Sequence, residues 1–271
     1  MIKAKDVNAR RIDADRVKVK WEIDDTTSNV LEYAFYILRS ESPEGPWETI
    51  AGPLTDQYEV YDATAPLRSG ARNLYYSVRT RHIQSQKTFN TFPVTTSPRP
   101  PLDALEIIRR NDLLFREFTG RPCILYPVRT FGQRCTDCFD VTTSRRTTSS
   151  CNTCWNTGFM RGYHTPVVVY VQIDPIGNPL QHIPPAMTDS KTTGARMGVY
   201  PLLKPRDILV ESENKRWRVA AVNHTERLRA PVRQELTLTT IPNSDVEYNI
   251  PVEWPNMETS PRSYSYRTDI Q

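Results

Sequence analysis

Long apolar runs are missing from this chain. No stretch approaches the roughly eighteen consecutive apolar residues of a membrane-spanning helix. The N-terminal segment MIKAKDVNARRIDADR is rich in charge and lacks the apolar core of a secretory signal. We therefore expect a protein that is made in a reducing cytoplasm and that has no membrane partner.

Glycine is also scarce, with 10 residues in 271, whereas proline is abundant, with 22. This balance favours short strands joined by stiff loops over a helical bundle. The chain has no glycine-rich phosphate-binding loop, dinucleotide fingerprint or G-x-S-x-G motif. The four histidines, His82, His164, His182 and His224, are scattered without metal-ligand spacing. Because no acid, base or nucleophile is clustered, we predict no catalytic residues and no enzyme activity.

A strong excess of one charge is absent as well. The formal net charge is +4 over the whole chain, and positive residues are not concentrated in one region. Nucleic-acid-binding domains gather lysine and arginine on one face or segment. We therefore expect no specific nucleic-acid partner.

Cysteine is rare, but its spacing is informative. Four of the five cysteines form C-x2-C-x12-C-x2-C, and each C-x2-C pair directs its two sulfurs toward one point. Two such pairs supply the four thiolates of a complete tetrahedral zinc shell, which leaves no position open for chemistry. We therefore predict one structural zinc per chain, bound by Cys135, Cys138, Cys151 and Cys154.

The residues around these cysteines support a structural metal. The intervening segment FDVTTSRRTTSS is polar and could not form a core without one. Other interpretations stay open: disulfides, which would need an oxidising compartment, a thioredoxin-like redox pair, or His164 in place of one cysteine. We expect Trp155, Phe159 and Tyr163 to pack over the sulfurs, and Cys123 to be a small buried hydrophobe.

The remaining periodicity predicts a mainly β protein with one central helix. Val17, Val19 and Trp21 alternate with charged residues, which predicts a half-buried strand in an N-terminal sandwich of about seven strands. The proline-rich segment 95–101 is the expected linker. The predicted organisation is a sandwich (1–99), a helix plus zinc ribbon (100–165), a small β-barrel with a long loop (166–254) and an extended C-terminal tail (255–271).

The helix is predicted over residues 102–119, after two prolines and before Gly120 and Pro122. Its apolar residues recur at helical spacing, and we expect them to pack on a core: Ala104, Ile107, Ile108, Leu114, Phe115 and Phe118. Its arginines are expected in solvent, or else facing an acidic partner or nucleic acid.

Five or six strands are expected in the C-terminal barrel, the last of them over residues 248–254. The segment 176–198 and the tail 255–271 have no periodicity. Neither can bury enough apolar area alone to offset the cost of ordering its backbone. We therefore expect both to become ordered only against neighbouring subunits.

Two parts of the chain resemble known families. The strand-B tryptophan Trp21, the hairpin RSESPEGPW and the strand YSVRT resemble a fibronectin type III domain, with Leu74 in place of the usual corner tyrosine. Over residues 102–252, the motifs GRPCILYP, TGFMRGY, KPRDILVE, WRVAAV and LRAPVRQELTL resemble structural proteins of tailed-phage virions. The last three are similar to the small β-barrels of neck and head–tail adaptor proteins.

This resemblance implies a virion component without catalysis. The family forms rings of identical subunits in the neck, so the implied partners are copies of the chain itself and neighbouring portal, adaptor or tail proteins. Two alternatives remain: a zinc-ribbon nucleic-acid module, favoured if the loop TTSRRTTSS and Arg109 and Arg110 form one basic face, and a tail-associated protein that binds a surface or carbohydrate.

Overall fold

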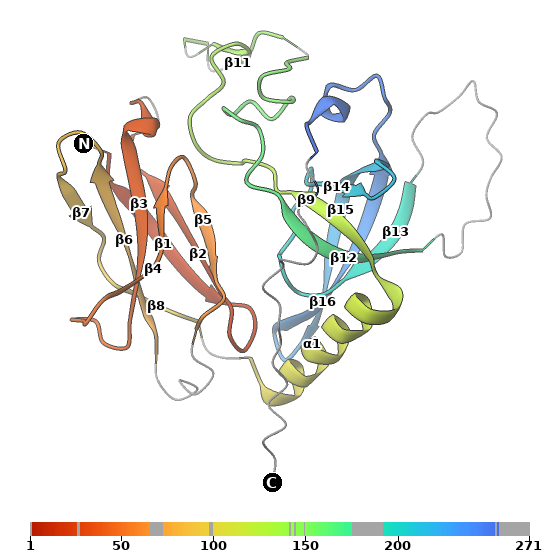
Figure 1. The fold of residues 1–271 in the computed structure, drawn as a ribbon, viewed down its shortest axis with the longest axis horizontal. Helices are drawn as coiled ribbons and strands as arrows, with labels where there is room; N and C mark the ends of the chain where they lie inside the picture. Colours follow the sequence, from red (N-terminus) through yellow and green to blue (C-terminus); the bar gives the residue numbers. More distant parts are fainter. Residues whose placement is uncertain are drawn as a thin grey trace.

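The computed structural model shows a mainly β protein with one α-helix (Figure 1). It describes residues 2–25, 28–65, 73–97, 100–140, 142–143, 145–148, 150–174, 192–252 and 254. Two β-rich bodies lie side by side in Figure 1, and a loop region that carries the four spaced cysteines lies above the junction between them. Within the described part of the chain, no helix has the length and hydrophobicity to cross a membrane.

The N-terminal body consists of two antiparallel sheets. One has the strand order β1-β2-β5, and the other has the order β4-β3-β6-β7, with β8 also paired to β6. The strands are β1 (Ala4–Arg11), β2 (Val17–Ile23), β3 (Tyr33–Ser40), β4 (Glu48–Leu54), β5 (Glu59–Asp62), β6 (Tyr75–His82), β7 (Thr88–Asn90) and β8 (Val94–Thr95), and a short 3₁₀ helix, η1 (Val30–Glu32), precedes β3.

One hydrophobic core holds these two sheets together. Val17, Val19 and Trp21 of β2 are fully buried, which confirms the alternation seen in the sequence. They pack with side chains of the facing sheet, among them Phe35 and Tyr76. Large aromatic side chains contribute most to such a core because each removes a large apolar area from water.

The helix α1 (Leu102–Leu114) begins directly after Pro101, and the helical turn η3 (Phe115–Thr119) continues it to Gly120. It lies along one side of the second body (Figure 1). Its packing differs from the expectation. Ala104, Ile108 and Phe115 are buried, but Ile107, Leu114 and Phe118 are exposed, because the barrel covers only one side of the helix.

The second body is a closed six-stranded barrel with the order β12-β13-β16-β15-β14-β9, so every strand is paired on both edges. Closure matters because an unpaired strand edge invites aggregation. Cys123 is fully buried in the barrel core, as expected. The strands are β9 (Arg121–Tyr126), β12 (Val167–Asp174), β13 (Thr192–Met197), β14 (Ile208–Glu211), β15 (Arg216–Arg227) and β16 (Ala230–Thr240).

Three expectations about this barrel were wrong in detail. It is not confined to residues 166–254, because β9 from the preceding region pairs with both β12 and β14. Strand β13 lies inside the segment 176–198 that we expected to be irregular. The expected last strand over 248–254 is replaced by the short helix η4 (Val246–Asn249) and an extended end. The rest of that segment and the expected tail, residues 175–191 and 255–271, lie outside the described residues.

A buried aspartate braces the barrel strands. Asp207 is 1% exposed, and its carboxylate accepts hydrogen bonds from the backbone N–H groups of Val128 and Lys204 at 2.8 and 2.7 Å. Burial raises the pKa of Asp207 to about 6, although both backbone hydrogen bonds oppose this shift.

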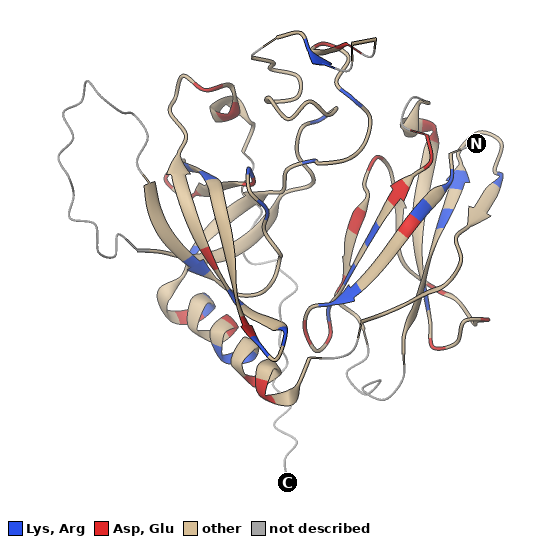
Figure 2. Cartoon of the chain, turned by 180° about the vertical axis from the view of Figure 1, so that it is seen from behind, with Lys and Arg blue, Asp and Glu red and all other residues tan. Residues whose placement is uncertain are grey.

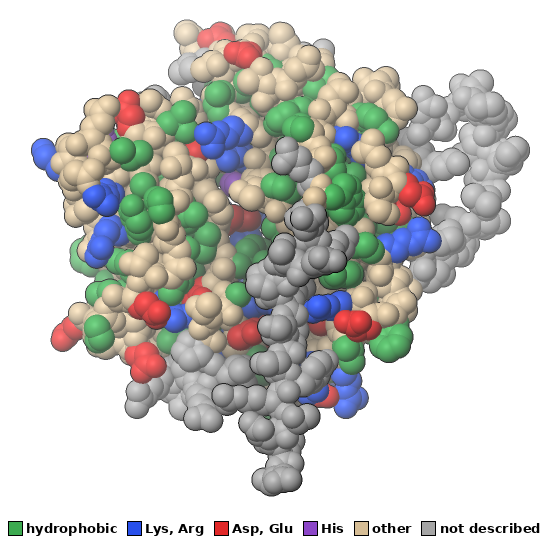
Figure 3. All heavy atoms as spheres, in the orientation of Figure 1, with side chains coloured by type: hydrophobic (Ala, Val, Ile, Leu, Met, Phe, Trp, Pro, Cys, Tyr) green, Lys and Arg blue, Asp and Glu red, His purple; other side chains and the backbone are tan. Residues whose placement is uncertain are grey.

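Charged and aromatic side chains join the two bodies. Glu59 of β5 lies 3.0 Å from Lys18 of β2 and 3.1 Å from Lys204 of the barrel side. Tyr61 and Tyr200 meet edge to face, with ring centroids 4.8 Å apart. The face drawn in Figure 3 shows a hollow between the bodies in which charged side chains and a histidine are visible.

The Glu59 carboxylate should make the stability of this junction depend on pH. Burial alone would raise its pKa, but the ammonium groups of Lys18 and Lys204 more than offset burial and hold it at about 2. A folded-state pKa below the ordinary value of 4.5 contributes stability that is present above pH 4.5 and is lost as the pH falls toward 2.

We therefore expect Glu59→Gln to lower the free energy of unfolding by roughly 1–3 kcal/mol at pH 7. The difference in the free energy of unfolding between this variant and the unsubstituted protein should shrink as the pH falls from 4.5 to 2. Urea denaturation at several pH values measures this difference. Glu44→Gln, at an exposed position, is the matched control. If Glu59→Gln lowered the free energy of unfolding by the same amount at every pH, the pH dependence would not come from the Glu59 carboxylate.

Candidate metal centre

The four spaced cysteines lie in a loop region between β9 and β12, which we call the ribbon (residues 127–164). Two chain segments form the base of the ribbon (127–134 and 157–164). We call this base the neck of the ribbon, which is unrelated to the neck of a virion. The two segments run antiparallel and are joined by bridges between Val128 and Tyr163 and between Arg134 and Phe159. Beyond the neck, the short strands β10 (Phe139–Asp140) and β11 (Arg145–Arg146) pair with each other.

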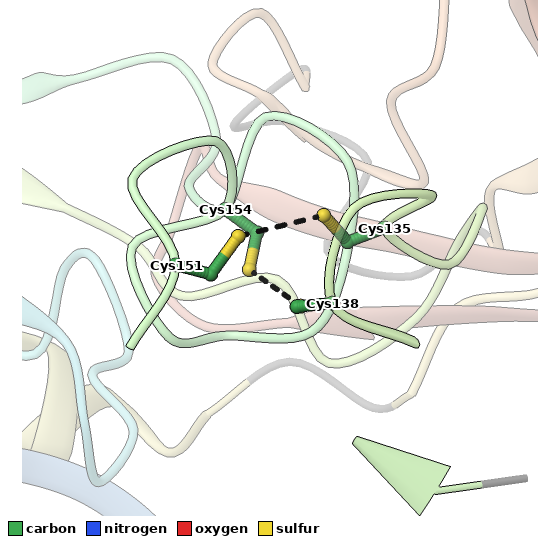
Figure 4. A group of neighbouring side chains, drawn as sticks. All are labelled: Cys135, Cys138, Cys151 and Cys154. Atoms are coloured by element: carbon green, nitrogen blue, oxygen red, sulfur yellow. Dashed lines mark hydrogen bonds between the residues drawn. The ribbon is translucent and has the colours of Figure 1, made fainter. Parts of the chain in front are cut away.

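The ribbon brings the four sulfurs together (Figure 4). Cys135, Cys138, Cys151 and Cys154 are buried, and their Sγ atoms all lie within 4.8 Å of one another. The Sγ atoms of Cys135 and Cys151 are 3.9 Å apart, and those of Cys138 and Cys154 are 3.4 Å apart. These distances exceed the disulfide bond length of about 2.05 Å, and all four thiols are free.

The separations suit a metal ion. Four sulfurs bonded to a central zinc at about 2.3 Å in tetrahedral geometry would be about 3.8 Å from one another, between the two distances above. Elsewhere in the described part of the chain, no other group of three or more histidine, cysteine or acidic side chains is arranged to hold a metal. The residues therefore fit a four-thiolate metal site.

The two C-x2-C turns have the same local construction. The Cys135 sulfur accepts hydrogen bonds from the backbone N–H groups of Asp137 and Cys138, and the Cys151 sulfur accepts them from Thr153 and Cys154. Each turn therefore presents two N–H dipoles to the first sulfur of its pair. Such dipoles stabilise the thiolate form that binds metal.

Burial and these hydrogen bonds act on the thiols in opposite directions. Burial raises the pKa of Cys138 well above its ordinary value. Burial also acts to raise the pKa of Cys151, but backbone and cysteine hydrogen bonds outweigh it and lower the pKa to about 7. Metal binding must displace the remaining thiol protons, so the affinity for metal should rise with pH.

Asn156 ties the second cysteine turn to its surroundings. Its side-chain oxygen accepts a hydrogen bond from the backbone N–H of Cys151 at 3.0 Å and one from the guanidinium of Arg146 at 3.2 Å. Its backbone carbonyl accepts hydrogen bonds from Arg146 and from Arg206 of the barrel. Sequence reasoning did not single out Asn156, because its partners Cys151, Arg146 and Arg206 lie 5, 10 and 50 residues away along the chain.

The aromatic residues near the site are arranged differently from the expectation. Trp155 and Tyr163, with ring centroids 6.4 Å apart, pack into a cluster at the end of the barrel. Phe159 lies under the guanidinium of Arg134, which also lies over Phe139. These rings join the ribbon to the barrel and to itself, and we assign them no role as a cover over the sulfurs.

A tight turn at Gly162 closes the ribbon. Its φ of 62° is in the left-handed region, and a Cβ atom there would lie 2.5 Å from the Cys154 carbonyl oxygen. Gly158, at φ 81°, donates its N–H to the Cys154 sulfur at 3.4 Å. Both glycines belong to the motif TGFMRGY, and both are needed for the chain to return past the cysteines.

The histidines lie outside the sulfur cluster. His164 follows the neck and is not part of the group of four, so the structure does not support it as a replacement ligand. Burial, followed by the nearby charge of Arg129, lowers the pKa of His164 to about 4, so the ring is neutral at pH 7. His82 contacts Tyr33 and Glu32 at the edge of the N-terminal body, and His182 lies outside the described residues.

Comparison of the chain with models of known protein families and with curated proteins gives no match. The functional argument therefore depends on the geometry of this chain.

Removal of one sulfur should abolish tight metal binding. We expect Cys138→Ser to weaken binding of cobalt(II), a coloured probe of tetrahedral thiolate sites, at least tenfold, because a complete shell loses a quarter of its ligands. Titration followed by the visible absorption of the cobalt–thiolate complex measures this. Cys123→Ser is the matched control, because Cys123 is buried in the barrel core. Equal cobalt binding by both variants would contradict the assignment.

Proposed function

We propose that this protein is a non-enzymatic structural component of a tailed-phage virion. Identical subunits form a ring in the neck of the virion, between the head and the tail. One zinc ion bound by the four cysteines stabilises the ribbon of each subunit. The zinc serves structure alone, since a shell of four protein thiolates has no vacant position for water or substrate.

The observation that carries this proposal is the construction of the barrel. The three motifs that resemble the barrels of virion neck and adaptor proteins fall on β14, β15 and β16, which are consecutive neighbours in the closed barrel. The motif GRPCILYP, which resembles virion structural proteins more broadly, falls on β9. This strand pairs with β14 although more than 80 residues separate the two in the sequence, so all four strands belong to one barrel.

The N-terminal body supports the second resemblance. Its three-stranded and five-stranded antiparallel sheets, with Trp21 in the core between them, support the inference of a fibronectin type III-like sandwich. We infer that this domain is a spacer or binding module of the subunit. Among its described residues we find no cluster of side chains suited to catalysis.

The nucleic-acid alternative loses the feature that would have favoured it. The strand β11, which carries Arg145 and Arg146, and the helix α1, which carries Arg109 and Arg110, lie at opposite ends of the molecule in both views (Figures 1 and 2). Arg109 and Arg110 are also paired with Glu106 on the same helix. They do not form one basic face with the ribbon.

The outer side of α1 is suited to contact between subunits. Leu102 and Phe118 are 76% and 77% exposed, and Leu113 and Leu114 are more than 40% exposed. Apolar side chains that gather on one element commonly mark a protein contact. A ring places the same surface of every copy against its neighbour, which would cover these side chains.

The location of the protein tests the proposal directly. We expect mass spectrometry of purified virions of the encoding phage to detect the chain in a fixed copy number. Elemental analysis should give one zinc per chain. The isolated protein should form rings at high concentration, visible by electron microscopy. A chain that stays monomeric and is absent from virions would overturn the proposal.

The exposed helix gives a second test. We expect Phe118→Glu to reduce the ring fraction at least tenfold in analytical ultracentrifugation, because a charge at a buried contact is costly. Circular dichroism and zinc content should stay unchanged, since Phe118 is exposed within the subunit. Phe92→Glu, at a 90% exposed phenylalanine of the N-terminal body, is the matched control. If Phe118→Glu assembled as well as the unsubstituted protein, the exposed side of α1 and η3 would not lie at the contact between subunits.

A further inference from the structure

The neck of the ribbon contacts the N-terminal body as well as the barrel. Arg129 of the neck donates a hydrogen bond to the backbone carbonyl of Asp56 at 2.7 Å and lies 3.0 Å from its carboxylate. Both side chains are almost fully buried, at 6% and 5% exposure. Two residues further along the neck, the Phe131 ring meets the edge of Tyr58 at a centroid distance of 5.2 Å.

These contacts reach into the core of the N-terminal body. Tyr58 is 2% exposed and packs against Phe35, with ring centroids 6.0 Å apart. Gly132 lies so close to Tyr58 that a Cβ atom would be 2.9 Å from its ring. The neck is therefore fitted against the body, and a small change in its path would break the contact.

Backbone hydrogen bonds between the two segments of the neck lie on both sides of this contact and extend to the cysteines. From the barrel outward, the carbonyls of Pro127, Gly162, Gln133 and Gly158 accept the backbone N–H groups of His164, Arg129, Met160 and Cys135, respectively, at 2.8 to 3.1 Å. The barrel fixes the inner end of this series of hydrogen bonds through Tyr126 of β9. The outer end stops at Cys135, so the sulfur cluster is what holds it.

Without metal the outer end has little to keep it paired. Between Cys135 and Cys154 the described residues include a single large apolar side chain, Phe139, and it is only partly buried. Four thiols in place of one metal–thiolate centre provide only weak hydrogen bonds between sulfurs across the ribbon. The pairing at Arg134 and Phe159 is therefore expected to open first, and Phe131 and Gly132 lie directly next to it.

We propose that the metal-bound ribbon is a strut that fixes the N-terminal body against the barrel. Metal binding keeps the outer neck paired, which holds Phe131 and Gly132 on Tyr58 and limits the relative motion of the two bodies. Loss of metal releases this contact, while the apolar cluster around Ile12 and the contacts of Arg129 with Asp56 and of Lys204 with Glu59 keep the bodies associated with a wider range of relative orientations. The proposal depends on metal binding by the four cysteines but not on a place in a virion.

The distance between the two bodies tests the strut. Donor and acceptor dyes are attached through a ketone-bearing amino acid at Lys5 of β1 and at Asn223 of β15, both exposed. Single-molecule energy transfer is then measured on the full chain with zinc and after chelation. We expect a narrow distance distribution with zinc and a distribution at least twice as wide without it. Circular dichroism is measured in parallel to show that the strands persist.

The variant Phe131→Ala tells whether the contact with Tyr58, and not a general effect of metal on folding, limits the motion of the two bodies. This variant should bind one zinc per chain, by elemental analysis, and yet show the wide distribution in its zinc-bound form. Phe92→Ala, at an exposed phenylalanine of the same body, should keep the narrow one. If chelation unfolds the chain, the zinc-bound Phe131→Ala protein alone decides the question.

Three results would overturn the proposal. One is a narrow distribution that persists after chelation with the strands intact, and another is a narrow distribution in zinc-bound Phe131→Ala. Failure of the unsubstituted chain to bind zinc is the third, and it would also remove the zinc from the proposed function. The first two would leave that zinc site in place.

Discussion

The meeting of four cysteine sulfurs at one point is the constraint on which the ribbon depends. Between Cys135 and Cys154, the described residues of the ribbon include a single large apolar side chain, Phe139, so burial alone cannot hold this part of it. A metal bonded to all four sulfurs would replace the missing core and convert two flexible turns into one rigid unit. Small domains that cannot bury enough surface commonly depend on such a cross-link.

The two β-rich bodies have no such dependence. Each has its own core of fully buried side chains, one around Trp21 and Phe35 and the other around Leu209 and Val219. Their junction combines two kinds of contact. Ile12 of the N-terminal body is fully buried in an apolar cluster with Ile108 of α1 and Val199 of the barrel side, and ion pairs and aromatic contacts surround this cluster. A buried pair such as Arg129 and Asp56 contributes little net stability but is costly to break on one side, so such pairs fix the geometry of the junction while the apolar cluster stabilises it.

The sequence was most informative where the determining interactions are local. The alternation around Trp21 predicted a strand of the N-terminal core, and the cysteine spacing predicted which four side chains meet. Strand β13 was missed because Thr192–Met197 contains Gly194 and has only two buried side chains, Ala195 and Met197. Its place between β12 and β16 comes from pairing over long sequence distances, which periodicity does not report.

The same limit explains the misplaced barrel boundary. The apolar run in RPCILY indicates burial, but it does not say whether these residues pair with the ribbon that follows or with a strand more than 80 residues later. The structure assigns it to the barrel, so the ribbon is an insertion between two adjacent barrel strands, β9 and β12. Both ends of the insertion are therefore held by the barrel at a fixed spacing. This arrangement explains how a segment without a core can present Arg129 and Phe131 to another domain: the barrel sets where the neck begins, and the sulfur cluster sets where it ends.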